Sequence, residues 1–300
     1  MSRAVSPSAN KPYGLARVCR IWKIPRSSVY EARDRAGKGR PAPKKRGPKP
    51  WIPDKDLLKR IREVLEKNTW TGEGYRKVWA RLRFQGIRVS QKRVLRLMRE
   101  HSLLAKDRPV PSGHSKDHKG TIIPERPNKI WGTDATSTWT EEGNATIFFV
   151  IDHFSADCLG IHAARRGTRF EALVPFRQAI RTIFGDFKEG IAGEEDLLLR
   201  HDHGSQFVSR AYQAEIRFVG VTSSPAYVRE PETNGCAERF VKTLKEQLLW
   251  PRRFKTIEEL NSALQKFMHD YNKSWIIQRH GYLTPSQARK QALEREEMVA

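Results

Sequence analysis

The stretch Thr146-Ile147-Phe148-Phe149-Val150-Ile151 decides the fold class of this 300-residue chain. Its unbroken run of β-branched and apolar side chains predicts a strand that is buried on both faces of a sheet. The segments 129–138 and 158–163, on either side of it, also have a strand-forming composition. We therefore expect three consecutive strands at the start of the main body of the protein.

Beyond these strands, helical and strand-like patterns alternate along the chain. The expected elements are helices at 169–184, 205–219 and 234–250, and short strands at 197–200 and near Val221. The order βββ-α-β-α-β-α is typical of a mixed α/β layer fold, which we assign to residues 129–250. Residues 251–300 have an amphipathic pattern and predict a helical C-terminal region.

Positive charge is concentrated in the first part of the chain. The sequence has 56 Lys and Arg against 34 Asp and Glu, a net charge of +22. Residues 1–128 hold 33 basic and 11 acidic residues, whereas residues 129–300 hold 23 of each. This distribution argues against a metabolic enzyme of ordinary surface charge and favours a basic arm that grips phosphates, joined to a neutral body. The alternative is a solvated basic tail without a specific partner.

Residues 1–36 predict two short helices with a proline-containing break between them, an arrangement that suits a helix-turn-helix segment. Two short helices are also common in small domains that do not bind DNA, so both interpretations stay open. Residues 37–50 are almost wholly Gly, Pro, Lys and Arg, and predict a basic linker. Within it, Lys44, Lys45 and Arg46 are candidates to contact a DNA backbone; a merely flexible connection is the alternative.

Residues 51–107 return to helical periodicity and predict a helical DNA-binding domain. After an interruption at Gly86, Ser90 is positioned to cap a third helix. A basic helix after a glycine turn is a candidate recognition helix for the major groove, and a solvated cationic face is the alternative. The basic side chains expected on its outer face are Lys92, Arg93, Arg96 and Arg99. Residues 108–128 lose periodicity, contain several prolines and predict a second linker.

The cysteines and the apolar runs bear on the compartment of the protein. Cys19, Cys158 and Cys236 lie far apart without metal-ligand spacing, so neither a disulfide framework nor a zinc site is expected. The N-terminus lacks the apolar run of a signal peptide, and no stretch approaches the roughly 18 apolar residues of a membrane span. We expect a reduced, soluble, intracellular protein with no membrane partner.

Three acidic residues are candidates for chemistry because of where they fall in the predicted elements. Asp134 lies in the first strand, Asp202 just beyond the fourth, and Glu238 in the first turns of the helix at 234–250. Strand ends meet at one rim of an open sheet, so these carboxylates are expected to converge. Clustered carboxylates repel one another unless cations neutralise them, and their hard oxygen atoms suit Mg²⁺ or Mn²⁺. Two such ions would support an in-line displacement at phosphorus.

Two lysines follow Glu238 at helical spacing. Lys242 and Lys245 come four and seven residues later, on the same face of the helix. We expect them to hold a DNA backbone beside the metal ions. The alternative is that Lys242 merely pairs with Glu238 or Glu246 along the helix.

The residues around these acids resemble a known family. The matching motifs are Trp131-Gly132-Thr133-Asp134, Asp152 with Ser155, Asp202 with Gly204-Ser205-Gln206-Phe207, and Asn234-Gly235 before Glu238. Thirty-five residues separate Asp202 from Glu238, the interval that this family uses. With these motifs the chain resembles the IS3-type insertion-sequence transposases (the second open reading frame product), within the retroviral-integrase-like DDE recombinases. The resemblance covers roughly residues 12–290.

The resemblance implies an RNase H-like core, two divalent metal ions, and DNA cleavage that frees a 3′-OH followed by strand transfer. It implies that Asp134, Asp202 and Glu238 are the catalytic, metal-binding triad and that Lys245 contacts DNA beside them. Asp152 is expected to have a structural role. The departures from the family pattern are His203 after the second aspartate, Ala156 after Ser155, and the loop Pro231-Glu232-Thr233; they bear on loop contacts and not on the triad.

The same resemblance implies the partners and the location. The first partner is double-stranded DNA, both as the terminal inverted repeats of the element and as the target. The second is other copies of the chain, in a dimer or a larger assembly. A third is a helix-turn-helix protein from an upstream reading frame. The implied location is the bacterial cytoplasm, at the nucleoid. Two other functions are kept in view: a structure-directed metal-dependent nuclease, and a transposase-derived DNA-binding protein without activity. Intact triad residues argue against the second, and joining of DNA ends would separate the transposase from the first.

Overall fold

The computed structural model describes residues 3–37, 50–105, 124–225 and 234–298 of the chain. It divides into two compact units, Met1–Pro53 and Asp54–Ala300. The first unit contains helices α1 (Leu15–Ile21) and α2 (Arg26–Gly37), close to the two short helices that the sequence predicts. In these two helices only Cys19 is buried, so this unit has almost no apolar core of its own among the described residues.

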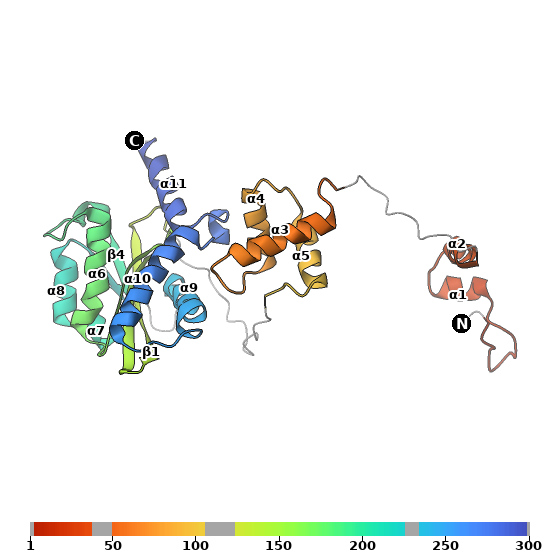
Figure 1. Ribbon diagram of the computed structural model, residues 1–300, viewed down its shortest axis with the longest axis horizontal. Helices are drawn as coiled ribbons and strands as arrows, with labels where there is room; N and C mark the ends of the chain where they lie inside the picture. Colours follow the sequence, from red (N-terminus) through yellow and green to blue (C-terminus); the bar gives the residue numbers. More distant parts are fainter. Residues whose placement is uncertain (1–2, 38–49, 106–123, 226–233, 299–300) are drawn as a thin grey trace. The chain divides into compact units, whose positions relative to one another are not determined.

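Three helices open the second unit: α3 (Asp54–Lys67), α4 (Tyr75–Phe84) and α5 (Gln91–Glu100) (Figure 1). Each has an apolar stripe that turns inward. The fully or nearly fully buried side chains are Leu57, Ile61, Val64, Val78, Leu82, Val94, Leu97 and Met98. As predicted, Ser90 caps α5, because its side chain accepts a hydrogen bond from the backbone N–H of Arg93.

A five-stranded mixed sheet forms the centre of the second unit. Its strands are β1 (Ile130–Thr140), β2 (Gly143–Asp152), β3 (Cys158–Ala164), β4 (Leu198–His201) and β5 (Thr222–Pro225), and their order is β3-β2-β1-β4-β5. The first three strands, which the sequence predicts, pair antiparallel in sequence order; β4 is parallel to β1, and β5 is parallel to β4.

Helices cover both faces of this sheet (Figure 1). On one face lie α6 (Arg169–Phe184), α7 (Ser205–Val208) and α8 (Arg210–Phe218); on the other lie α9 (Gly235–Leu244) and α10 (Ile257–Ser274). Strand β2 contributes to both cores, because Phe149 packs with α9 and α10 whereas Phe148 packs with α6 and α8. The double burial predicted for 146–151 is therefore confirmed, and the fold is RNase H-like.

Two predicted helices differ from the sequence pattern. The helix expected at 205–219 is two helices, because Ser209 leaves the helical conformation and caps α8 by accepting from the N–H of Tyr212. The helix expected at 234–250 changes after Leu244 into a π-helical turn, η3 (Lys245–Leu249). Apolar periodicity does not report either change, because both depend on local hydrogen bonds. The remaining described elements are η1 (Gly193–Glu195), η4 (Gln278–His280) and α11 (Pro285–Glu297).

The segment that leads into α4 is fastened to the C-terminal helices. Trp70 packs edge-on against the ring of Trp275 with centroids 5.1 Å apart, and its indole N–H donates to the hydroxyl of Ser274 at 2.9 Å. Next to it, the backbone N–H and the hydroxyl of Thr71 donate to Oε1 of Gln247, and the Gln247 amide donates back to the Thr71 carbonyl. The helical part at 54–105 is thereby attached to η3, the turn that directly continues α9.

Asp152, at the end of β2, is a fully buried carboxylate that joins three segments. Its oxygens accept hydrogen bonds from the backbone N–H of Asn128 at 2.9 Å and from the N–H and hydroxyl of Ser155 at 2.7 and 3.0 Å. A guanidinium nitrogen of Arg289 on α11 lies 3.7 Å away. These contacts satisfy a buried charge, which is the structural role expected for this residue.

Asp157 is a second buried carboxyl group in the same region, and it makes stability depend on pH. Burial raises its pKa to about 7, Arg289 acts to lower it and Asp152 raises it further. Because the pKa of Asp157 is higher in the folded protein, folding favours the protonated carboxyl. The resulting stabilisation is complete at pH values below the pKa of the unfolded state, and it is lost as the pH rises through about 7. We predict that Asp157→Asn is more stable than the wild type at pH 8, by at least about 1 kcal/mol, with the difference vanishing near pH 4. Urea unfolding across this pH range measures it, and a difference that does not change with pH would contradict it.

Gly160 in β3 lies directly under α6. A Cβ atom at this position would overlap the carbonyl group of Pro175, which is backbone and unable to move aside cheaply. We predict that Gly160→Ala lowers the free energy of unfolding by about 1–3 kcal/mol, as overpacking of a core does. Gly193→Ala is the matched control, because a Cβ there meets no atom within 4 Å. Thermal unfolding of the two variants side by side is the measurement, and equal melting temperatures would show that α6 shifts freely.

Candidate active site

Asp134 lies in the middle of β1, opposite Phe149 of β2. Its side chain is half-buried, and Oδ1 accepts a hydrogen bond from the backbone N–H of Ala135 at 2.7 Å. Strand β1 lies between β2 and β4, so the backbone that carries this carboxylate is held in the centre of the sheet.

Asp202 directly follows β4, the parallel neighbour of β1. The residue before it, His201, is buried and clamps the turn: one ring nitrogen lies 2.6 Å from the Asp202 carbonyl oxygen and the other 2.8 Å from the hydroxyl of Ser223. The Asp202 side chain is exposed, and Oδ1 accepts from the N–H of Gly204 at 2.9 Å. The sequence pattern assigns His201 no role; a histidine at the end of a predicted strand, immediately before a candidate ligand, is the signal by which it could be found.

Glu238 is exposed in the first turn of α9. This helix lies on the sheet through Phe240, whose ring centroid is 4.8 Å from that of Phe149. The start of the helix comes very close to β1, because a Cβ on Gly132 would lie 2.8 Å from Oδ1 of Asn234 and 2.6 Å from the ring of His153. A Cβ here would require the side chains of His153 and Asn234 to shift, and its absence lets the helix N-terminus approach the strand that carries Asp134.

Asp134 lies within the electric field of Asp202 and Glu238. The pKa of Asp134 is raised to about 6, chiefly by burial, and Asp202 and Glu238 raise it further, whereas its hydrogen bond to Ala135 and the charge of Lys245 lower it. Repelling carboxylates of this kind are hard oxygen donors, and a divalent cation between them would relieve the repulsion. As they stand in the described part of the chain, no three Asp, Glu, His or Cys side chains are gathered tightly enough to hold a metal ion.

The lysines and arginines singled out from the sequence differ in their surroundings. Lys245 is half-buried in η3 and close enough to act on Asp134, while Lys242 is exposed on α9. On α5, Lys92 and Arg99 are exposed. Lys44, Lys45 and Arg46 lie outside the described residues.

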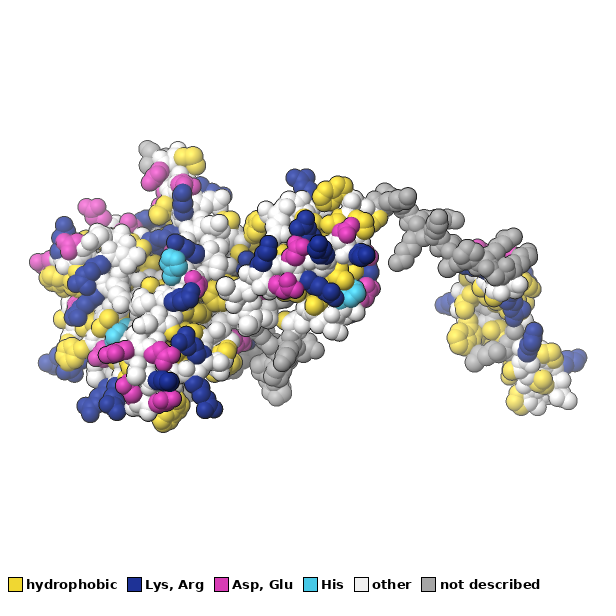
Figure 2. Space-filling view, in the orientation of Figure 1, with side chains coloured by type: hydrophobic (Ala, Val, Ile, Leu, Met, Phe, Trp, Pro, Cys, Tyr) yellow, Lys and Arg dark blue, Asp and Glu magenta, His cyan; other side chains and the backbone are white. Residues whose placement is uncertain are grey.

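The interpretation of Arg93 as part of an outer face requires correction. Its side chain is only 17 % exposed and is bound to a carboxylate oxygen of Asp54 at the start of α3. Arg96 shares Asp54 and also pairs with Glu100. Figure 2 accordingly shows basic and acidic side chains interspersed over α3–α5. The basic periodicity of α5 did not reveal Asp54, because the pair is 39 residues apart.

Comparison with known families gives three matches along the chain. Residues 53–109 match the HTH-like domain, and residues 124–231 and 219–285 match two models of the integrase core domain. The transposase of insertion sequence element IS629 from Shigella sonnei is 26 % identical over 290 residues, covering 93 % of this chain and 92 % of that protein. Along nearly its whole length the chain is thus similar to insertion-sequence transposases, which is consistent with a transposase of the IS3 type.

Further proteins similar to this chain are also a transposase and an integrase. Transposase InsD of insertion element IS2 from Escherichia coli is 29 % identical over 204 residues, or 65 % of each chain. Among solved structures, the catalytic core domain of HTLV-2 integrase, determined in complex with magnesium, matches with a TM-score of 0.41 and 21 % identity over 55 % of this chain and 98 % of that one. The protein is a DDE-type enzyme that cuts and joins DNA, with an HTH-like domain before its integrase core. In the part of the chain that the structure describes, no helix is long and apolar enough to cross a membrane.

Proposed function

We propose that Asp134, Asp202 and Glu238 together bind two divalent cations, Mg²⁺ or Mn²⁺, at which this transposase cuts and joins DNA. The observation that carries the proposal is the placement of Asp134 in β1, Asp202 directly after the parallel neighbour β4, and Glu238 at the start of α9, which approaches β1 at Gly132. In keeping with this placement, Asp202 and Glu238 both act to raise the pKa of Asp134, although they are 68 and 104 residues away in the chain. Their oxygen donors fit a hard cation. We propose that Glu238, at the exposed start of α9, moves closer to the other two when DNA and metal bind.

When bound, the cations would activate the attacking oxygen and stabilise the leaving oxygen at phosphorus. The protein's own groups then have positioning roles. His201 and Gly204 orient Asp202, and Lys245 holds the phosphate backbone beside Asp134. In the first step, water attacks a phosphodiester at the element end and leaves a 3′-OH. In the second, this hydroxyl attacks a target phosphodiester and displaces its 3′ oxygen, so neither step needs a covalent bond to the protein.

We propose that residues 51–107 read the DNA of the element end. Of the four basic residues considered on α5, Lys92 and Arg99 are the exposed pair without a described ion partner in this structure, so they are the stronger candidates for phosphate contacts. Lys242 would extend this basic track along α9, and Lys44, Lys45 and Arg46 would contact the backbone from the linker at 37–50. Residues 1–36 would act as an additional helix-turn-helix segment.

We propose that the active form is a dimer or larger assembly on DNA, because transposition joins two element ends in one complex. A helix-turn-helix protein from an upstream reading frame would be a further partner, and the assembly would act in the bacterial cytoplasm at the nucleoid. Light scattering with and without element-end duplexes measures the assembly. A single chain per duplex at saturating protein would contradict this part of the proposal.

The test of the proposed reaction uses a labelled oligonucleotide duplex that carries the element end, a supercoiled plasmid as target, and Mg²⁺ or Mn²⁺. We expect a nick at the end, followed by covalent joining of the label to the plasmid. A duplex of scrambled end sequence is the control. Nicking without joining under conditions that support binding would identify a nuclease instead and contradict the proposal.

A further inference from the structure

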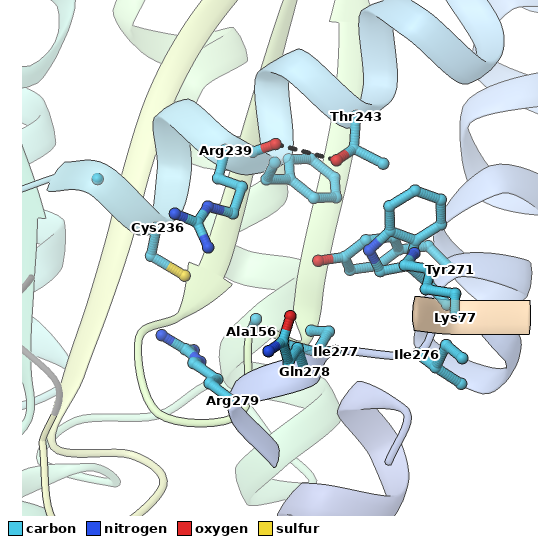
Figure 3. A pocket seen from close by; sticks show the side chains of 13 residues that line it. Lys77, Ala156, Cys236, Arg239, Thr243, Tyr271, Ile276, Ile277, Gln278 and Arg279 are labelled. Atoms are coloured by element: carbon cyan, nitrogen blue, oxygen red, sulfur yellow. Dashed lines mark hydrogen bonds between the residues drawn. The ribbon is translucent and has the colours of Figure 1, made fainter. Parts of the chain in front are cut away.

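A cavity of about 390 Å³ lies along one flank of α9 (Figure 3). Helical spacing separates the two flanks: Cys236, Arg239 and Thr243 line the cavity, whereas Glu238 and Lys245 follow another stripe of the same helix. Its other walls come from the end of α10 and the chain through Gln278 and Arg279, with Lys77 of α4 at the rim. One helix thus presents an acid to the candidate active site and a second surface to this cavity.

The walls combine aromatic surface with positive charge. Phe240, Tyr271 and Trp275 form the apolar side, and Arg239 and Arg279 are the cations that converge near Cys236 in Figure 3. None of the lining residues is an Asp or a Glu. Arg239 is exposed on α9, and Arg279 is held in place because it donates hydrogen bonds to the backbone carbonyls of His153 and Phe154. Such a cavity suits an anion that also has a flat apolar part.

Tyr271 adds a hydroxyl group to the wall of the cavity. Its side chain is 3 % exposed, and Figure 3 shows its hydroxyl directed into the cavity. The ring is fixed by stacking on Phe267 and Trp275. Burial raises the pKa of the phenol well above its ordinary value, so the hydroxyl remains a donor at neutral pH. A ligand that enters the cavity therefore meets an oriented hydrogen-bond donor in its wall.

We propose that this cavity binds one nucleotide of the DNA strand being cut, with its base against the aromatic wall and its phosphate at Arg239 and Arg279. The inference rests on the proposed function, which brings that strand to α9. A nucleotide has the required flat base, hydrogen-bonding edge and negative charge. Extruding a base costs a few kcal/mol, and stacking on aromatic side chains together with Arg–phosphate contacts offsets this cost. Binding here would hold the strand across α9 while Glu238 faces the scissile phosphate.

The experiment uses the full chain and element-end duplexes in which 2-aminopurine replaces one base at a time around the cut. Divalent cations are omitted so that no cutting occurs. We expect a fluorescence change of about threefold or more at one or two adjacent positions, because a base that leaves the duplex loses its neighbours. Tyr271→Phe keeps the packed ring but removes the hydroxyl, and Arg239→Ala removes the exposed cation; both should lose more than half of this change.

Lys273→Ala is the matched control, because Lys273 is an exposed cation on α10 that does not line the cavity. It should keep the full signal, and fluorescence anisotropy in parallel shows that each variant binds the duplex. Binding by the wild type with no position-specific change would overturn the inference and leave the proposed function standing. An equal signal in all three variants would also overturn it. Failure of the wild type to bind the element end over a scrambled duplex would refute the proposed function, and this inference with it.

Discussion

Asp134→Asn should reduce both cutting and joining by at least about 1000-fold while leaving element-end binding intact, because in the proposed site several kcal/mol of metal-derived stabilisation would depend on this carboxylate. The amide keeps the shape of the side chain but carries no charge to neutralise a cation. The fold should not suffer, since burial and two nearby acids already disfavour the charged form of Asp134. Single-turnover assays of nicking and joining with the labelled end measure the loss.

Metal binding gives an independent readout for the same variant. Without divalent cations, Asp134→Asn should unfold at the same temperature as the wild type or a higher one. Added Mn²⁺ should raise the melting temperature of the wild type and not that of the variant, because a ligand stabilises only a protein that binds it. Asp186→Asn, a change of an exposed acid outside the site, is the control. Joining activity that survives in Asp134→Asn would refute the assignment of the triad.

Asp152→Ala should destabilise the protein by about 3–5 kcal/mol, which is the effect of removing one partner from a buried charge pair. The backbone N–H groups of Asn128 and Ser155 would lose their acceptor, and Arg289 would lose a negative charge 3.7 Å from its guanidinium. Denaturant unfolding is the measurement. Glu189→Ala, which removes an exposed acid, should change stability by less than about 0.5 kcal/mol. Equal stabilities for these two variants would show that Asp152 does not hold β2, residue 128 and α11 together.

The sequence predicts the strands of the core well because their signal is local. The run at 146–151 is apolar throughout, and its two sides do enter two separate cores. The helix at 169–184 is also found at the predicted residues. The change to a π-helical turn at Lys245 is different, because it depends on which carbonyl accepts each hydrogen bond and leaves no mark on the apolar pattern.

The sequence nominates the members of the candidate site but does not predict their geometry. Motifs around Asp134, Asp202 and Glu238 single them out, but the rise in the pKa of Asp134 depends on how deeply β1 is buried and on how closely β4 and α9 bring the other two acids. For Arg93, the sequence pattern predicts the wrong surroundings. A helical stripe assigned it to an outer face, whereas Asp54, far away in the chain, binds it. Non-local partners of this kind decide which charges remain available to a ligand.

The attachment of Trp70 and Thr71 to the C-terminal part has a consequence for retargeting such enzymes. A chimaera that exchanges only the helices at 54–105 would leave Gln247 and Ser274 facing a foreign loop. Gln247 lies two residues after Lys245, for which we propose a phosphate contact, so a poor graft would disturb the proposed site as well as the choice of DNA. Grafts that carry a Trp-Thr pair before their second helix, or that import matching residues at 247 and 274, would be the ones to retain activity.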